Sequence, residues 1–241
     1  KESIFGQEIR KSEFVFASPL RDFSERKKTE PKPLLELTNI SLNFSLLKAF
    51  FDCPYSFKFY TFYGFQNPLG ARMGYGSAIH NALMAVHRSF LEGKEIKPSD
   101  LPGILQQHIN FPYATAAMEE DMTKRANKAV DIYYNSNAED FKNILFAEKE
   151  IQIDLGDGIL VNGFMDLITK KNLDGTEETT IIDFKSTEDA QAYNASIDQL
   201  QMYALGYDVL TGEKADFLEI YNLDKNEPSK VELFVSDLEN I

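Results

Sequence analysis

The spacing of apolar residues changes from helical to strand-like near residue 144, and the elements that follow limit the possible folds more than any other feature. Three β-branched, alternating or apolar runs follow one another at residues 144–153, 159–169 and 179–185. Turn sequences at 154–158 and 172–175 separate them, so we expect a three-stranded meander. A helix is then expected at 196–210 and a strand at 216–222, with a further candidate strand at 231–235.

Helical spacing marks the first half of the chain. It predicts a helix over 43–58 that is interrupted at Cys53-Pro54 and capped by Asn43 or Ser45. Three further helices are expected at 77–92, 101–110 and 117–135. Helices followed by three strands, a helix and a strand predict the α/β (α+β) class with a small mixed sheet.

Aromatic residues are concentrated in one segment. Ten of the chain's 30 phenylalanines and tyrosines lie within 44–65, where only Lys48 and Lys58 bring positive charge. Such a segment is either a helical part of the core or a platform on which nucleobases stack. We favour core packing.

The composition is that of a globular protein: 241 residues, 43% of them hydrophobic and 26% charged. No window approaches the roughly 18 apolar residues of a membrane span, and the single cysteine, Cys53, excludes an intrachain disulfide. We therefore expect a soluble cytoplasmic protein with no membrane partner. The net charge of −13 argues against strong binding to a polyanion but not against cutting one, because metal-dependent phosphodiester hydrolases need carboxylates.

The N-terminal segment differs from the rest. Residues 1–33 are rich in charge, end in a Pro-x-Pro step and hold one short alternating run at 13–17. Because the chain also begins with Lys1, we expect a piece cut from a longer polypeptide. Its predicted organisation is a linker or the tail of a preceding domain at 1–38 and one domain at 39–241.

Two carboxylates interrupt the second and third strand-like runs. Asp183 and Lys185 are two residues apart, which places their side chains on one face of a strand, with Ile182 and Phe184 on the other. If the two strands pair, Asp166 and Asp183 converge and need a counter-charge. Mg²⁺ or Mn²⁺ prefers such an oxygen-rich environment, whereas a partly buried Asp-Lys pair at a sheet edge is the structural alternative.

These residues resemble a known family. Asp166, followed by Asp183-Phe184-Lys185, is similar to the Asp-x(n)-(Asp/Glu)-x-Lys signature of the PD-(D/E)xK nuclease superfamily. Three more segments resemble motifs of its RecB-like and AddAB-like branch, in family order: Cys53-Pro54-Tyr55-Ser56-Phe57, Gly76-Ser77-Ala78-Ile79-His80 and Gln199-Leu200-Gln201-Met202-Tyr203. The resemblance covers about residues 40 to 225.

The resemblance implies a fold and a metal site. The fold would be a restriction-endonuclease-like core of order αβββαβ with an N-terminal helical elaboration. His80, Asp166 and Asp183 would bind Mg²⁺ or Mn²⁺ together with the backbone carbonyl of Phe184. Lys185 would serve the attacking water or the transition state of phosphodiester hydrolysis.

Three more residues receive expected roles from the resemblance. Gln199 and Tyr203, four residues apart on one helix face, would orient the DNA backbone or the strands of the active site. Glu148, at the start of the first strand, would support the site.

The function implied is that of a Mg²⁺- or Mn²⁺-dependent deoxyribonuclease in DNA recombination or repair. It would act as an exonuclease or single-strand endonuclease, and DNA and a helicase domain or subunit would be its partners. A catalytically silent module that binds DNA or a helicase partner is the main alternative. A metal hydrolase acting on other substrates has only generic carboxylates in its favour.

Other sites are not supported by the sequence. Some relatives hold an iron–sulfur cluster on four cysteines, but this chain has only Cys53, which we expect to be a buried small residue beside the helix break. His87 and His108 are expected to be ordinary surface or helix-end residues. The acidic turns lack EF-hand spacing, and no Walker A sequence occurs.

Overall fold

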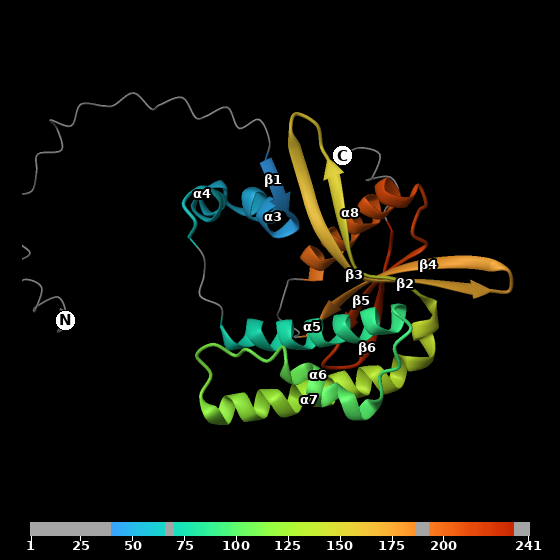
Figure 1. Ribbon diagram of the computed structural model, residues 1–241. Coiled ribbons are helices and arrows are strands. Elements are labelled where there is room, and N and C mark those ends of the chain that lie inside the picture. The colour runs from blue at the N-terminus through green and yellow to red at the C-terminus, as the bar shows by residue number, and fades with distance from the viewer. Residues whose placement is uncertain (1–39, 66–69, 187–192, 234–241) are drawn as a thin grey trace, which may run out of the picture. The chain divides into compact units, whose positions relative to one another are not determined.

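The computed structural model describes residues 40–65, 70–186 and 193–233, all of which lie in the unit Asn39–Ile241. Within them, six strands form a mixed sheet (Figure 1). The strands are β1 (Ile40–Asn43), β2 (Ile144–Asp154), β3 (Ile159–Leu173), β4 (Thr176–Lys185), β5 (Phe217–Asn222) and β6 (Glu227–Val231). The expected strand at 13–17 and the end of the run at 231–235 lie outside the described residues.

The long strand β3 organises the sheet because it pairs with three others. β2 pairs antiparallel with it along residues 160–169, so β1 and β4 must share its opposite edge. On that edge β1 runs parallel beside residues 159–162, and β4 runs antiparallel beside residues 167–173. Residues 163–166 lie between these two ladders without a strand partner on that edge among the described strands. Asp166 therefore sits at a gap in the sheet.

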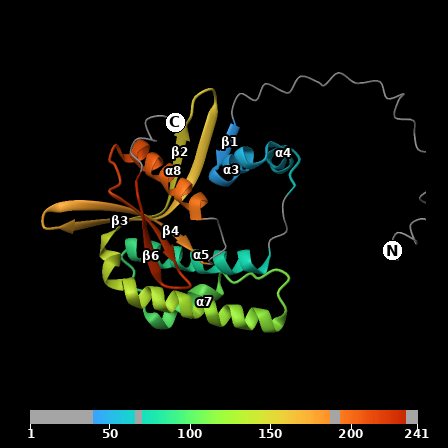
Figure 2. The same ribbon diagram turned by 180° about the vertical axis from the view of Figure 1, so that it is seen from behind.

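Helices lie on both faces of the sheet. The helices are α3 (Phe44–Asp52), α4 (Pro54–Phe62), α5 (Ala71–Leu91), α6 (Leu101–Gln106), α7 (Ala116–Asn137) and α8 (Tyr193–Thr211), with short 3₁₀ turns η2 (Pro98–Asp100) and η3 (Ala138–Asn143). Figure 2 shows α5 and α7 on one side of the sheet and α8 on the other. The helix α8 is the crossover that lets β4 and β5 run parallel. The predicted α/β (α+β) class with a small mixed sheet is confirmed.

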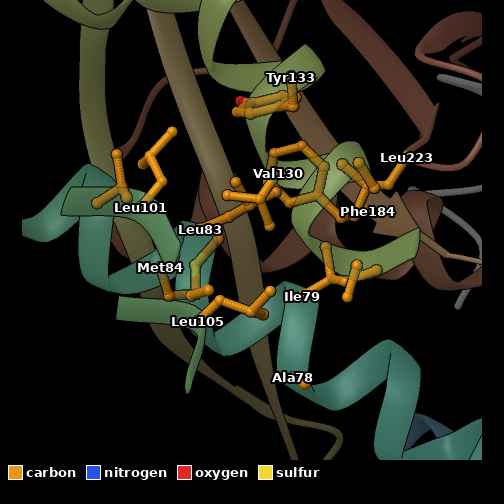
Figure 3. Packing of buried hydrophobic residues seen from close by; sticks show 14 of the residues in the cluster. Ala78, Ile79, Leu83, Met84, Leu101, Leu105, Val130, Tyr133, Phe184 and Leu223 are labelled. Carbon is orange, nitrogen blue, oxygen red and sulfur yellow. The ribbon is translucent and has the colours of Figure 1, made fainter. Parts of the chain in front are cut away.

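Two apolar clusters fix these layers. Beneath α5 and α7, Ile79, Leu83, Val130 and Phe184 pack together (Figure 3). Beneath α8, the buried cluster includes residues of β2, β3, β4 and the helix itself: Ile151, Met165, Ile168, Ile181 and Leu200. Because each fully buried large side chain contributes roughly 1.5–3 kcal/mol, these clusters hold α5 and α8 firmly against opposite faces.

The predicted meander and the helix at 196–210 are confirmed, but some boundaries differ. α5 begins at Ala71, before the expected start at residue 77, so the segment with Gly74 and Gly76 is part of the helix. A Cβ atom on Gly74 would lie 2.1 Å from the carbonyl oxygen of Asn110, so this glycine serves close packing rather than a turn. β1 was not predicted, and β6 lies at 227–231, earlier than expected. It is an edge strand with the polar sequence Glu-Pro-Ser-Lys-Val, which carries no apolar alternation.

The helix break at Cys53-Pro54 and the cap at Asn43 are confirmed. Asn43 Oδ1 accepts a hydrogen bond from the N–H of Leu46 at 2.9 Å at the start of α3, and α4 begins at Pro54. Cys53 between them is half-buried rather than buried.

The expectation that the aromatic segment packs into the core is wrong. No residue of α3 or α4 is buried. Their aromatic rings pack on one another instead, for example Phe50 edge-on to Phe57 with centroids 5.3 Å apart. Six rings of the two helices remain exposed: Phe50, Phe51, Tyr55, Phe59, Tyr60 and Phe62. Helical spacing predicts an apolar face, but it does not say what covers that face.

The expectation for His87 is also wrong. It lies within α5 and is fully buried, with its Nε2 atom 3.1 Å from Oη of Tyr133 and its ring stacked on Phe184. Burial lowers the pKa of His87 to about 3, so the imidazole is neutral in the folded chain.

The buried His87 should make stability depend on pH. Since its pKa is about 3 when folded and near 6.5 when unfolded, only the unfolded chain takes up this proton between those values. The contribution of neutral His87 to the free energy of unfolding is therefore expected to be fully present above pH 6.5. It should be lost on acidification, by up to about 1.4 kcal/mol per pH unit. Urea unfolding from pH 7.5 to 4.5, compared with His87→Gln, measures the effect. Equal pH slopes for the two proteins would contradict it.

The contact between α8 and β2 depends on Gly206. A Cβ atom there would lie 2.3 Å from Cδ1 and 3.0 Å from Cβ of Ile151, so we expect Gly206→Ala to lower the free energy of unfolding by about 1–3 kcal/mol. Gly103→Ala in α6 is the matched control, because nothing lies within 4 Å of the added methyl group. It is expected to raise stability by roughly 0.5–1 kcal/mol. Denaturant titrations of both variants test this, and a similar loss in each would refute the packing argument.

Candidate active site

Asp166 connects three elements at the gap in β3. Its Oδ1 atom is 2.8 Å from Nε2 of His80 in α5, and its Oδ2 atom accepts a hydrogen bond from the backbone N–H of Phe184 in β4 at 2.8 Å. The residue is only 8% exposed, so these contacts replace water that the carboxylate has lost. The β3–β4 ladder ends at the pair Leu167 and Ile182, so Asp166 lies opposite Asp183, one residue beyond the ladder.

A second set of contacts begins at Asp183, which is 2% exposed. Its Oδ2 atom is 2.7 Å from Nζ of Lys185, an ion pair that lacks hydrogen-bond geometry. Lys185 Nζ also donates to Oε1 of Gln199 at 3.4 Å, and Gln199 Nε2 donates to Oη of Tyr203 at 2.6 Å. Two strand residues and two α8 residues thus form one polar chain that runs from the sheet to the helix.

The face assignment made from the sequence agrees with this arrangement. Phe184 lies in the apolar cluster beneath α5 and Ile182 packs against that cluster, on the face opposite Asp183 and Lys185. All seven predicted positions lie within these two groups of contacts: His80, Asp166, Asp183, Phe184, Lys185, Gln199 and Tyr203. Their predicted roles remain predictions.

Glycine explains how α5 comes close to the end of β4. A Cβ atom on Gly76 would lie 2.5 Å from Oγ of Ser186, so a larger residue would require the Ser186 side chain to turn away. A cavity of about 250 Å³ lies here, lined by His80 of α5 and by Lys185 of β4. In the Gly-Ser-x-x-His segment, Gly76 therefore lets α5 lie close to Ser186, and His80 places a ring nitrogen beside Asp166.

Burial and neighbouring charges both shift the protonation of the site. Burial raises the pKa of Asp183 to about 6, with a further contribution from the charge of Asp166, although Lys185 opposes the shift. For His80, burial lowers the pKa, but the hydrogen bond to Asp166 and the nearby carboxylates outweigh it and leave the pKa raised. Both shifts mean that the site favours an added positive charge.

Glu148 stands at a strained point beside the site. Its φ of +51° is uncommon for a residue other than glycine, and the ladder pairs on either side place it opposite Asp166. Its carboxylate forms an ion pair with Arg88 and contributes to the raised pKa of His80. Sequence reasoning missed Arg88, which lies eight residues, or just over two helical turns, after His80 in α5.

Sequence reasoning also missed a cavity on the other side of Gln199 and Tyr203. Its volume is about 400 Å³, and its lining also includes Asn162, Phe164, β1 and the start of α3. Phe164 is 51% exposed although it lies two residues before Asp166 in an apolar strand. In the sequence, the aromatic residue Phe164 two positions before Asp166 is the signal that could have indicated this cavity.

The donor types at this site suit a divalent metal ion. Asp166 and Asp183 supply carboxylate oxygens, and His80 supplies a ring nitrogen. The backbone of Phe184, between Asp183 and Lys185 in the chain, supplies a carbonyl oxygen. Within residues 40–65, 70–186 and 193–233, however, no three His, Cys, Asp or Glu side chains are already grouped to hold a metal ion. The carboxylates instead have protein partners: His80 and the Phe184 N–H contact Asp166, and Lys185 contacts Asp183.

None of the described helices is long and apolar enough to cross a membrane.

Comparison with known proteins bears on the whole domain. No curated protein matches the chain. A solved structure titled "Crystal structure of SSO0001" shares 15% identity, with 68% of this chain and 69% of that chain covered and a TM-score of 0.30. The sequence profile of the PD-(D/E)XK nuclease superfamily matches residues 41–240, which is most of the chain and includes every contact of the site described above. The chain belongs to the PD-(D/E)XK nuclease superfamily.

Proposed function

We propose that the chain is a Mg²⁺- or Mn²⁺-dependent deoxyribonuclease that hydrolyses phosphodiester bonds as an exonuclease or single-strand endonuclease. Membership of a nuclease superfamily suggests the reaction class and implies DNA as substrate. The observation that supports competence is the convergence of His80, Asp166, Asp183 and Lys185 from three elements onto one small region. A retained acid, base and cation at one place is what hydrolysis of a charged ester requires.

The residues divide into two groups by what they would do. His80, Asp166, Asp183 and the carbonyl oxygen of Phe184 would hold the metal ion. When bound, the ion supplies positive charge to the scissile phosphate and makes water a better nucleophile near neutral pH. The raised pKa of Asp183 is consistent with this assignment, because an added cation would stabilise the ionised carboxylate that burial disfavours.

Lys185 would act on the substrate rather than on the metal. Its ammonium group now neutralises Asp183, and Gln199 holds it from the other side. From this position the Lys185 ammonium group would contact the attacking water or the phosphate oxygens. Tyr203 fixes Gln199 through their 2.6 Å hydrogen bond, so these two α8 residues would position Lys185 and the neighbouring DNA backbone.

The wider context rests on the motif order. The Gly-Ser-x-x-His and Gln-x-x-x-Tyr segments resemble the RecB-like branch, so we place the domain, residues 39–241, in a helicase–nuclease of DNA recombination or repair. Residues 1–38 would then be a linker or the tail of a preceding domain, and a helicase domain or subunit would deliver the DNA.

A catalytically silent module that binds DNA or a helicase partner is the second candidate. The contacts that favour it are the internal ion pairs, because Asp166 and Asp183 already have protein partners and the cluster is neutralised without metal. Metal binding and cleavage distinguish the two proposals.

The first test is degradation of linear single- and double-stranded DNA with Mg²⁺ or Mn²⁺. We expect cleavage to require metal and to fall by roughly a hundredfold or more in Asp183→Ala and in Lys185→Ala, since each removes charge at the reacting phosphate. Asp131→Ala and Lys142→Ala are matched controls, because both residues are exposed and outside the site. They should cleave as the unchanged chain does.

Metal titration by calorimetry completes the test. Binding that is lost in Asp166→Ala and Asp183→Ala, together with cleavage, supports the nuclease. Absence of both cleavage and carboxylate-dependent binding would overturn the site and favour the silent module. Binding without cleavage would indicate a site that needs its helicase partner to deliver DNA.

A further inference from the structure

A third cavity, of about 660 Å³, forms a groove between α5 and α7 and has no part in the site described above. Its α7 lining comes from residues spaced three or four apart, which is one face of that helix. Three cationic side chains line it: Arg72, Arg125 and Lys128. The lining is therefore more basic than a chain with a net charge of −13 would lead one to expect.

The cations of this groove are available to a ligand. Arg72 and Lys128 are exposed, and neither has an ion pair with any acidic group in the described residues. Arg125 lies over the ring of Tyr75, 5.1 Å from its centroid, and its contact with Asp121 is long at 4.0 Å. Packing on Tyr75 thus holds Arg125 in place, whereas Arg72 and Lys128 have no ion-pair partner among the described residues.

The acidic residues of the groove do not reverse this balance. Asp224 accepts a hydrogen bond of 2.6 Å from Oη of Tyr75, which gives its carboxylate a partner within the wall of the groove. With Asp121, the lining holds two acidic residues against three cations. A ligand that carries several negative charges is the one that this lining would attract.

The groove adjoins the candidate active site. Tyr75 and Asp224 line the groove, while their chain neighbours Gly76 and Leu223 line the cavity that holds His80 and Lys185. The hydrogen bond between Tyr75 and Asp224 therefore forms part of the wall that the two cavities share. A polymer held at Lys185 can continue past this wall into the groove.

We propose that the groove between α5 and α7 binds the phosphate backbone of the DNA strand whose scissile phosphate lies at Asp166 and Asp183. This proposal rests on the proposed nuclease function. Arg72, Arg125 and Lys128 contact phosphates, so the groove holds the strand in register without reading its sequence. The acidic chain thereby gains a local path for a polyanion that its net charge would otherwise repel.

The experiment compares two double variants of the full chain that remove the same charge. Arg72→Gln/Lys128→Gln alters the groove, whereas Lys142→Gln/Lys214→Gln removes two exposed cations elsewhere. Fluorescence anisotropy with a labelled 20-nucleotide single strand, in EDTA and over a range of salt concentrations, measures binding. We expect the groove variant to bind about tenfold more weakly, with a salt slope shallower by about 1.4, from about 0.7 for each of two phosphate contacts. The control should keep the slope of the unchanged chain.

Several results would overturn the proposal. These are equal loss of affinity in both double variants, an unchanged slope in the groove variant, or no measurable binding by the unchanged chain at low salt. Thermal melting by circular dichroism confirms that each variant is folded, which is expected because all four residues are exposed. Arg125 is left unchanged because it packs on Tyr75.

Hydrolysis of bis(p-nitrophenyl) phosphate separates this proposal from the nuclease function itself. The small diester reaches the site but not the groove, so the groove variant should hydrolyse it at the rate of the unchanged chain while its KM for DNA rises about tenfold. A chain that cleaves neither substrate fails as a nuclease, yet the anisotropy comparison still decides whether the groove binds DNA. Equal losses on both substrates would show that the groove residues act on the site and would overturn the proposal.

Discussion

The carboxylate of Asp166 is the contact on which the arrangement of this domain depends. One oxygen meets His80 of α5, and the other accepts the N–H of Phe184 where the β3–β4 ladder has ended. A side chain here replaces a strand-to-strand hydrogen bond, so the two strands can separate without leaving that N–H unpaired. The separation opens the sheet beside Asp183, and the same carboxylate holds α5 at the opening. Fold and site therefore share one interaction.

The helices on the two faces of the sheet contribute different residues to the site at that opening. α5 brings His80 and, through Arg88, supports Glu148 in its left-handed conformation. α8 brings Gln199 and Tyr203, and it can approach because the sheet and the helix each carry a glycine at the contact. A Cβ atom on Gly163 would lie 2.9 Å from the ring of Tyr203, and one on Gly206 would meet Ile151. Small residues set the distances, and the polar residues then come within hydrogen-bond range.

The correct and the incorrect expectations have different physical origins. The meander, α8 and the face of β4 that carries Asp183 and Lys185 could be predicted because strand and helix periodicity are local properties of the backbone. The burial of His87 and the exposure of the α3–α4 aromatic residues could not, because each depends on what lies against a helical face. The close packing of Gly74 against Asn110 has the same origin, because it depends on which segment lies beside α5.

The sequence by itself determined the three-stranded meander, the helix that follows it and the residue types of the site. Asp166, Asp183-x-Lys185 and the Gly-Ser-x-x-His and Gln-x-x-x-Tyr segments are short patterns that depend on local spacing. Only the tertiary structure decided which side chains meet. It paired Asp166 with His80, joined Lys185 to Gln199, brought Arg88 to Glu148, and gathered Arg72, Arg125 and Lys128 around one groove. The physical reason is that these contacts join residues far apart in the chain, and their distances are set by how helices and strands pack rather than by local spacing.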